Sequence, residues 1–189
     1  YDEEEDEDDS ESEGSSSSDT KLETKMQNQK MFKLKDDSIY KYDGPHTHSP
    51  TKYNYDYQSN KETVLATEKL NCPPGVLFEI LFGSNNKLTL DLLKSQDGSD
   101  FSEFSEFAPN DKGNKERSYK YEKGLNYGVG PKSTTCYAKE TIESFDLEGH
   151  INVVNTTQTP NVPSGGAFTV KTRYILTWAE QNTSQMIVS

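Results

Sequence analysis

Apolar and polar residues alternate most regularly between positions 167 and 178. One side of this segment is mostly apolar and consists of Phe168, Val170, Thr172, Tyr174, Leu176 and Trp178. The other side is mostly polar and consists of Ala167, Thr169, Lys171, Arg173, Ile175 and Thr177. Successive side chains of a strand point to opposite faces of a sheet. The pattern therefore predicts an antiparallel strand with one buried, aromatic-rich face.

The same alternation predicts a meander of antiparallel strands in the second half of the chain. The Gly-Val-Gly-Pro sequence at 128–131 is a turn signal between two alternating segments. The predicted strands of this half cover residues 117–127, 132–144, 150–159, 167–178 and 185–189. In the first of them, one face consists of Tyr119, Tyr121, Leu125 and Tyr127. Short polar connections between consecutive strands are typical of antiparallel hairpins.

The first half of the chain predicts one strand and two short helices. Residues 62–70 alternate as in a strand. A helix follows, with Asn71 as its expected N-cap and Gly83 as its end. Its apolar stripe consists of Leu77, Ile80 and Leu81, with Phe78 and Phe82 beside it. A second helix is predicted at 88–94. One strand, a small helical insertion and a meander together predict an α+β fold.

Two aromatic-rich segments follow no regular period. Residues 37–60 contain many Tyr, Pro and turn-forming residues, which predict an extended arm instead of a helix. Phe101, Phe104 and Phe107 are three positions apart. This spacing fits either one helical turn or an aromatic-rich loop that packs on the sheet, and the sequence leaves both alternatives open.

The charge of the chain is concentrated in its N-terminal part. The net charge is -12, and residues 1–19 hold eleven of the 32 acidic residues and none of the 20 Lys and Arg residues. Because apolar side chains are scarce there, we expect residues 1–36 to be a disordered acidic, Ser-rich segment and a Lys-containing linker. The rest is nearly neutral and shows no basic stripe, so we expect no nucleic-acid binding. The predicted domains are therefore 1–36, an extended arm at 37–61 and an α+β domain at 62–189.

No segment of the sequence carries the pattern of a catalytic or metal site. A nucleophile elbow, a P-loop and a dinucleotide fingerprint are all absent from it. His46 and His48 have the spacing of two metal ligands, but no third ligand lies near them in the sequence. We expect Glu140 and Glu143 to be surface charges that point to opposite faces, and not an acid/base pair. The expectation is therefore a protein that is not an enzyme and has no metal or cofactor.

The remaining chemical candidate is a site for an apolar ligand. Large apolar side chains of the predicted helix and strands are candidates to line one concave space: Phe78, Leu81, Phe82, Tyr119, Tyr121, Tyr127, Phe168, Tyr174 and Trp178. Tyr and Trp combine an apolar ring with one hydrogen-bonding group, which suits an amphiphile with a single hydroxyl. The pattern alone favours a packed core over a cavity, and it leaves both open.

Three motifs, taken in their order and spacing, resemble one known family. They are the Gly-Pro-His-Thr-His-Ser-Pro-Thr sequence at 44–51, the Pro-Pro-Gly-Val-Leu-Phe-Glu-Ile-Leu-Phe-Gly sequence at 73–83, and Gly-Pro-Lys at 130–132 with the loop at 159–166 and the strand that ends at Trp178. Together they resemble the StART-like (VASt) domains of the fungal LAM family of sterol transporters. The resemblance covers residues 43–189.

The resemblance implies a helix-grip fold. In this fold, a curved antiparallel sheet with short N-terminal helices wraps a long C-terminal helix around a sterol cavity. The sequence shows no counterpart of that C-terminal helix, so we expect the chain to be a truncated piece of a longer protein. Val170 and Leu176, on the same face of residues 167–178 as Tyr174, are further cavity candidates. The resemblance also implies a gating loop that contains Pro160, Val162, Pro163, Gly165 and Gly166.

The function implied by the resemblance is the binding and non-vesicular transfer of sterol between membranes at endoplasmic reticulum contact sites. The expected ligand is an ergosterol-like sterol. The other expected partner is an anionic membrane surface, contacted transiently from the cytosolic side. The alternative is an adaptor that transports nothing, has a filled core and recruits a partner through its acidic tail. The sequence does not indicate an oligomeric state.

Overall fold

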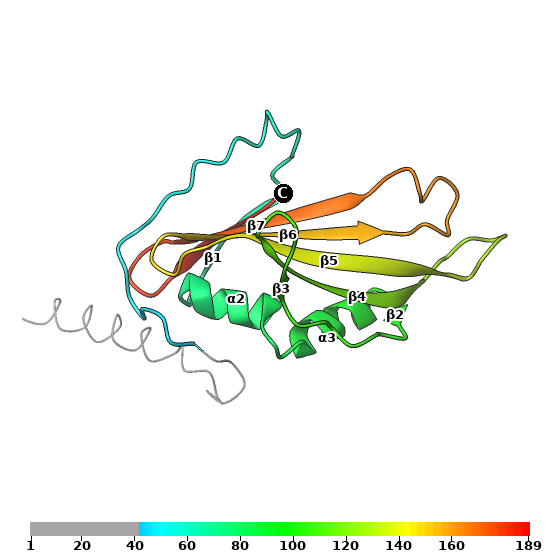
Figure 1. Cartoon of the computed structure of the whole chain (residues 1–189), viewed down its shortest axis with the longest axis horizontal. Coiled ribbons are helices and arrows are strands. Elements are labelled where there is room, and N and C mark those ends of the chain that lie inside the picture. Colours follow the sequence, from blue (N-terminus) through cyan, green and yellow to red (C-terminus); the bar gives the residue numbers. More distant parts are fainter. Residues whose placement is uncertain (1–41) are drawn as a thin grey trace, which may run out of the picture. The chain divides into compact units, whose positions relative to one another are not determined.

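The computed structural model describes residues 42–189 (Figure 1). The predictions for residues 1–36, and for residues 37–41 of the arm, lie outside the described residues. The two helices are α2 (Pro74–Phe82) and α3 (Lys87–Ser95). The strands are β1 (Ala66–Leu70), β2 (Gly98–Ser99), β3 (Ala108–Pro109), β4 (Lys115–Gly124), β5 (Ser133–Phe145), β6 (His150–Gln158), β7 (Val170–Trp178) and β8 (Ser184–Val188).

All of these strands belong to one antiparallel sheet. They pair in the order β1-β8-β7-β6-β5-β4-β2, and β3 also pairs with β4. The strands β4 to β8 are neighbours both in the chain and in the sheet, which confirms the predicted meander. The early strand β1 pairs with the last strand, β8, at the edge of the sheet. The first and last parts of the domain therefore lie side by side.

The helices lie against one face of the curled sheet, which we call the inner face (Figure 1). This arrangement confirms the α+β prediction and fits a helix-grip sheet with short helices. The helix α2 ends at Phe82, directly before Gly83, as predicted. Glycine is required at 83, because a Cβ atom there would lie 2.3 Å from the carbonyl oxygen of Glu79. The predicted cap is wrong, since Pro73 occupies the N-cap position and no side chain caps the helix.

The arm at 42–61 crosses the opposite, outer face of the sheet (Figure 1). The Thr51 N–H donates to the carbonyl oxygen of Trp178 at 3.0 Å, and the Thr51 hydroxyl accepts from the Trp178 N–H at 3.0 Å. The Tyr53 ring stacks on the His150 ring with centroids 3.8 Å apart. The extended conformation predicted for the arm is therefore confirmed for most of its described residues, and it is held by contacts with β6 and β7.

The arm changes the environment of β7. Arg173, Ile175 and Thr177 belong to the side that was predicted to be polar and exposed, yet all three are buried. The prediction of a strand with one buried face is wrong for this half of β7. The physical reason is that a segment more than a hundred residues earlier in the chain covers the second face, and local alternation carries no information about it.

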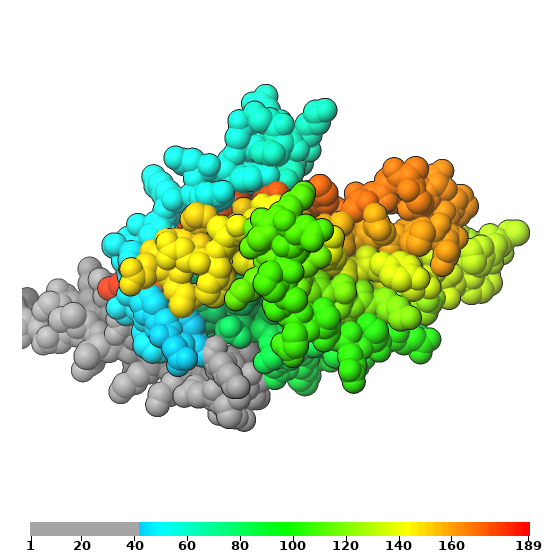
Figure 2. All heavy atoms as spheres, in the orientation of Figure 1, coloured from blue at the N-terminus to red at the C-terminus, as the bar shows by residue number. Residues whose placement is uncertain are grey.

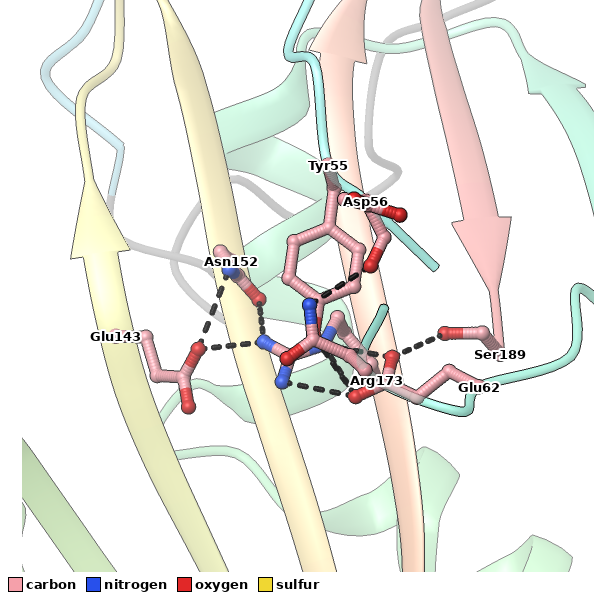
Figure 3. Close-up of polar contacts among 8 residues, drawn as sticks. Tyr55, Asp56, Glu62, Glu143, Asn152, Arg173 and Ser189 are labelled. Carbon is pink, nitrogen blue, oxygen red and sulfur yellow. Dashed lines mark hydrogen bonds and ion pairs between the residues drawn. The ribbon is translucent and has the colours of Figure 1, made fainter. Parts of the chain in front are cut away.

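The guanidinium group of Arg173 on β7 joins the arm to the sheet (Figure 3). The Arg173 Nε donates to both carboxylate oxygens of Glu62, at 3.0 and 3.2 Å, and Nη1 donates to Asn152 and to Glu143. The ring of Tyr55 lies 4.3 Å from the guanidinium carbon. Burial alone would raise the pKa of Glu62, but hydrogen bonds from Arg173 and Tyr55 outweigh it and lower that pKa. This ionic cluster therefore fastens the end of the arm to β7.

Candidate functional site

The inner face of β4 is lined with stacked aromatic rings. Phe104 lies parallel to Tyr119 with centroids 3.8 Å apart, and Phe101 stacks on Tyr121 at 5.8 Å. Cys136 and Ala138 of β5 complete this buried cluster. Two of the predicted cavity residues, Tyr119 and Tyr121, thus lie side by side on the expected face.

The three spaced phenylalanines belong to a loop and not to a helical turn. Their segment runs along the edge of β4, where the Ser102 N–H donates to Lys120 and the Ser105 N–H donates to Ser118, at 2.9 and 3.0 Å. The short strands β2 and β3 pair with β4 at its two ends. The structure therefore selects the second of the two alternatives, an aromatic-rich loop that packs on the sheet.

A second aromatic group surrounds the C-terminal half of α2. Phe78 and Phe82 are neighbours on the helix, with ring centroids 5.7 Å apart. Phe82 meets the Tyr174 ring edge-on at 5.3 Å, and Phe78 meets Phe145 at 4.9 Å. The helix positions these rings because its buried residues include both Phe78 and Phe82. The structure thus brings together three predicted residues from the helix and β7, while Leu81 is half-buried beside them.

A buried ion pair lies between the two aromatic groups. The Arg117 Nε and the Glu140 Oε2 are 2.6 Å apart, and the two side chains are only 4% and 2% exposed. The guanidinium carbon lies 5.1 Å from the Phe104 ring and 4.7 Å from the Phe107 ring. Nη1 donates to the carbonyl oxygen of Gly83 at 2.8 Å. Arg117 therefore fastens the end of α2 and the phenylalanine loop to the sheet.

This pair corrects the expectation that Glu140 is a surface charge. Burial raises the pKa of Glu140, although the charge of Arg117 opposes that shift. Arg117 was missed in the sequence, yet its alternation with Tyr119 and Tyr121 was a usable signal of its inward direction. Its Nη2 atom is buried and finds no acceptor among the residues that the structure describes. Glu143 points to the outer face and bonds Arg173, so the predicted opposite facing is confirmed.

Beside the Arg117–Glu140 ion pair, the inner face carries neutral hydroxyl and amide groups. The hydroxyl of Tyr119 is 3.5 Å from the side-chain nitrogen of Asn155. Burial raises the pKa values of Tyr119 and Tyr174, so both hydroxyls stay protonated at neutral pH. Within residues 42–189 there is no group of three or more His, Cys, Asp or Glu that would hold a metal ion. The face suits the binding of an amphiphile with one neutral polar group.

The other predicted cavity residues lie at the two ends of the sheet. Leu176 and Trp178 are fully buried at one end, where the Trp178 Nε1 donates to the carbonyl oxygen of Leu147 at 2.8 Å. Tyr127, Phe168 and Val170 are exposed at the other end. The eleven candidates therefore fall into separate groups, and their role in a ligand cavity stays a prediction.

The predicted gating loop is compact. Its N–H groups at Val162, Gly165 and Ala167 each donate to the carbonyl oxygen three residues earlier. Gly165 is required by a close approach, because a Cβ atom there would lie 1.8 Å from the carbonyl oxygen of Thr159. Gly166 faces open space. A steric requirement therefore explains glycine at 165, whereas an added Cβ atom at 166 would meet no neighbouring atom.

Two concave sites adjoin α2. One has a volume of about 500 Å³. Its lining combines apolar residues with polar ones: Phe78, Phe107, Ile142 and Phe145 with Asn114, Lys115, Glu143 and Ser144. The other, of about 270 Å³, lies between Phe82, Phe104 and Arg117. The larger volume is in the range of small-ligand pockets, which are mostly apolar and contain a few polar groups.

Comparison with known proteins identifies the family. Residues 64–189 match the model of the VASt family, described as the VAD1 Analog of StAR-related lipid transfer domain. The chain belongs to the VASt family. This membership confirms the resemblance drawn from the motifs, and the match begins close to β1 of the described domain.

Two fungal relatives of this VASt domain show similarity over most of the chain. The membrane-anchored lipid-binding protein LAM5 of Saccharomyces cerevisiae is 42% identical over 166 residues, which cover 86% of the chain and 25% of the relative. An uncharacterised membrane protein of Schizosaccharomyces pombe is 29% identical over 143 residues, which cover 76% of the chain and 18% of the relative. The chain thus spans a quarter or less of the length of these relatives. Among the described residues, neither helix has the length and hydrophobicity that a bilayer crossing requires.

Proposed function

We propose that this VASt domain binds a sterol and carries it between membranes at endoplasmic reticulum contact sites, on their cytosolic side. The observation that carries the proposal is the family match over residues 64–189, which places the chain in a lipid-transfer family. The name of the yeast relative, a membrane-anchored lipid-binding protein, supports a lipid ligand and work at a membrane. The proposed activity is carriage, with no covalent chemistry.

The aromatic inner face supports a sterol as the ligand. A sterol is a rigid, flat ring system with a single hydroxyl, and we propose an ergosterol-like molecule. Flat rings pack well against aromatic faces such as Tyr174 and Phe82, whose contacts are given above. Burial of the sterol supplies the driving force, about 25 cal/mol per Å² of apolar area. A neutral hydroxyl such as that of Tyr119 is a suitable partner for the single polar group of the ligand.

The loop at 160–166 is the proposed gate. It connects β6 with β7, next to the exposed side chains of Phe168 and Val170. Gly166 has open space around it and is the proposed hinge, whereas Gly165 keeps the turn closed by its close backbone contact. In this mechanism the domain contacts a membrane, the gate opens, the sterol enters along β7, and the gate closes for transfer.

The test is the transfer of a fluorescent sterol from donor to acceptor liposomes, together with a titration of the same sterol in solution. Tyr174→Ala is expected to weaken sterol binding roughly tenfold, in line with the loss of an aromatic contact and its burial. Lys120→Ala is the matched control, because Lys120 is exposed on the face of β4 opposite to Tyr119 and Tyr121. Circular dichroism checks that both variants are folded. Wild-type transfer no faster than the protein-free background would refute the proposal.

An adaptor remains the second candidate, favoured by one observation. The end of the sheet around Trp178, Leu176 and Ile175 is packed without exposed surface, as in an ordinary core. An adaptor of this kind would bind its partner through the acidic residues 1–19. The adaptor hypothesis predicts that the domain does not bind the fluorescent sterol in solution. It also predicts that removal of residues 1–19 abolishes the interaction with the partner.

A further inference from the structure

The arm carries a motif that the proposed function does not use. Residues 49–52 read Ser-Pro-Thr-Lys, so a serine is followed directly by proline and, three positions after it, by lysine. The motif lies next to the end of β7, where Thr51 and Trp178 exchange the hydrogen bonds described above. Figure 2 shows the arm, from blue to cyan, as part of the outer surface of the molecule. The motif is therefore open to a partner in solution.

Ser49 presents a free hydroxyl group to solvent. Both Ser49 and Pro50 are exposed. The backbone carbonyl oxygen of Ser49 lies 2.7 Å from the Nδ1 atom of His48, but the hydroxyl has no hydrogen-bond partner among residues 42–189. A hydroxyl that is neither buried nor bonded can react without the loss of a contact that holds the fold.

Two other hydroxyl groups of the arm are engaged in the fold. The Thr51 hydroxyl donates to the carbonyl oxygen of Gly149 at 2.7 Å and accepts from the Trp178 N–H at 3.0 Å. The Ser59 hydroxyl donates to the carboxylate of Asp56. Neither of these two residues is followed by proline. The free hydroxyl and the following proline are thus combined in one residue of the arm, Ser49.

The backbone around Ser49 is extended and is fixed at only a few points. A residue that precedes proline is confined to extended conformations. The N–H groups of His48 and Thr51 donate to the carbonyl oxygens of Gln181 and Trp178, at 2.8 and 3.0 Å. Between them, the Ser49 N–H makes no hydrogen bond to the residues that the structure describes. Local opening of two backbone hydrogen bonds therefore frees this stretch without unfolding the sheet.

The order of residue types fits the substrate cleft of a proline-directed serine/threonine kinase. Such a cleft binds its substrate as an extended chain, and the subsite after the reacting serine offers no acceptor for a backbone N–H. Proline has no N–H to lose there, whereas any other residue would bury an unpaired donor. A negatively charged subsite further along the cleft selects a cation, so charge adds to the discrimination. Pro50 and Lys52 supply both features.

One other proline in the chain follows a hydroxyl residue. Pro160 follows Thr159, but the third position after Thr159 is Val162, which carries no charge. Thr159 is half-buried, and its carbonyl oxygen accepts from the Val162 N–H in the compact loop at 160–166. The combination of a following proline and a cation three positions on therefore occurs once in the sequence, at 49–52.

We propose that Ser49 is a phosphorylation site for a proline-directed serine/threonine kinase. The Ser49 Oγ atom attacks the γ-phosphorus of the magnesium-bound ATP held by the kinase, and a bond between them forms. The bond from that phosphorus to the oxygen that bridges the β- and γ-phosphates breaks, ADP leaves, and the hydroxyl proton passes to a carboxylate of the kinase. The product carries about two additional negative charges at neutral pH.

The phosphate is expected to mark the surface of the domain and to leave its fold intact. Ser49 is exposed, so the phosphate stays in water and displaces no buried group. Ser49 is also not among the residues proposed to contact the sterol. The inference therefore goes beyond the proposed function and does not depend on it.

The experiment is incubation of the whole chain with magnesium-ATP and a purified kinase of this class, followed by mass spectrometry. Transfer of one phosphate to Ser49 is expected, and Ser49→Ala is expected to abolish it. Lys52→Ala is expected to slow the transfer about tenfold, whereas Lys52→Arg keeps the cation and the rate. Ser59→Ala is the matched control, because Ser59 is an exposed serine of the same arm without a following proline. Circular dichroism checks that all variants are folded.

Two further measurements make the outcome decisive. A synthetic peptide of residues 44–55 shows the rate at which the kinase modifies the motif without the fold. The whole chain expressed in yeast cells is expected to carry phosphate on Ser49 and, as Ser49→Ala, to lack it there. A peptide that is phosphorylated while the folded chain is not, or phosphate that is found only on other residues of the chain, overturns the proposal. Equal rates for Lys52→Ala and wild type overturn the role of the cation.

Discussion

The two ends of β7 share one alternating pattern but lie in different surroundings. From Arg173 to Trp178 the strand is covered on both faces, by α2 on the inner side and by the arm on the outer side. At its beginning, Phe168 and Val170 expose about half of their surface. The alternation is equally regular in both parts. A period of two therefore identifies a strand, but the segments that pack on it decide which of its residues are core residues.

The largest expected effect tests the packed end of this comparison. Trp178→Ala is expected to lower the free energy of unfolding by about 3–5 kcal/mol, the usual range for a fully buried aromatic side chain. It also removes the hydrogen bond to Leu147. Phe168→Ala, just before the exposed end of β7, is expected to change the free energy of unfolding by less than about 0.5 kcal/mol. Urea denaturation measures both, and similar losses would show that the two ends are not different.

The second prediction compares two ion pairs that both join β4 to β5. Glu140→Gln leaves the charge of Arg117 buried without its partner and is expected to cost about 3 kcal/mol. Glu116→Gln disrupts an exposed pair with Lys139 and is expected to cost less than about 1 kcal/mol. The measurement is again urea denaturation at neutral pH. A cost of Glu116→Gln as large as that of Glu140→Gln would contradict the structural role assigned to burial.

The third prediction concerns the arm that covers the outer face. Glu62→Gln weakens the contact with Arg173 and is expected to cost about 2 kcal/mol, the range of hydrogen bonds to charged groups. The pKa of Glu62 is lowered in the folded state, so its contribution is present above the ordinary value of 4.5 and is lost as the pH falls through the lower folded value.

Two measurements check this expectation for the arm. The difference in stability between wild type and Glu62→Gln is expected to be full at pH 7 and to shrink below about pH 4.5. Limited proteolysis near Tyr57 is expected to be faster in the variant, because the end of the arm is released. Glu148→Gln, a change at an exposed position, is the control. A stability difference that stays constant down to pH 3 would show that this carboxylate does not hold the arm.

The smallest expected effect concerns two adjacent glycines of the exposed end. Gly165→Ala places a Cβ atom against the carbonyl oxygen of Thr159 and is expected to cost about 1–2 kcal/mol. Gly166→Ala has open space and is expected to stay within about 0.5 kcal/mol. Thermal unfolding measures both variants. Equal effects of the two changes would indicate that the turn tolerates a shift at Gly165.

Much of the fold was predictable because its elements are locally encoded. Both helices and the five strands of the meander were predicted to within a few residues. Gly83 was predicted to follow the end of α2, and a larger side chain there would clash with the backbone carbonyl of Glu79, four residues earlier. The predictions failed where distant segments meet. The cap at Asn71 was wrong, and Glu140 was placed on the surface because its partner, Arg117, lies on another strand.

The candidate site was predictable only in part for the same reason. Tyr119, Tyr121, Phe82 and Tyr174 were chosen from their faces, and the structure places them on the inner side of the sheet. Arg117 was overlooked, because a charged residue is ordinarily solvent-facing, although the alternation places this one on the face of Tyr119 and Tyr121. Its burial depends on Glu140 and on the phenylalanines of the loop at 101–107. No pattern in the sequence indicates that these residues all contact Arg117.

The sequence by itself determined the period-two strands, the two helices and the motifs that mark the VASt family. These features depend on residues close together in the chain, where backbone geometry links position to direction. Only the tertiary structure decided that the arm covers β7, that Arg117 holds the buried carboxylate of Glu140, that Arg173 binds Glu62 of the arm's end, and that Phe168 and Val170 stay exposed. Such features depend on strand register and on contacts across a hundred residues, and local alternation is the same whether or not those contacts form.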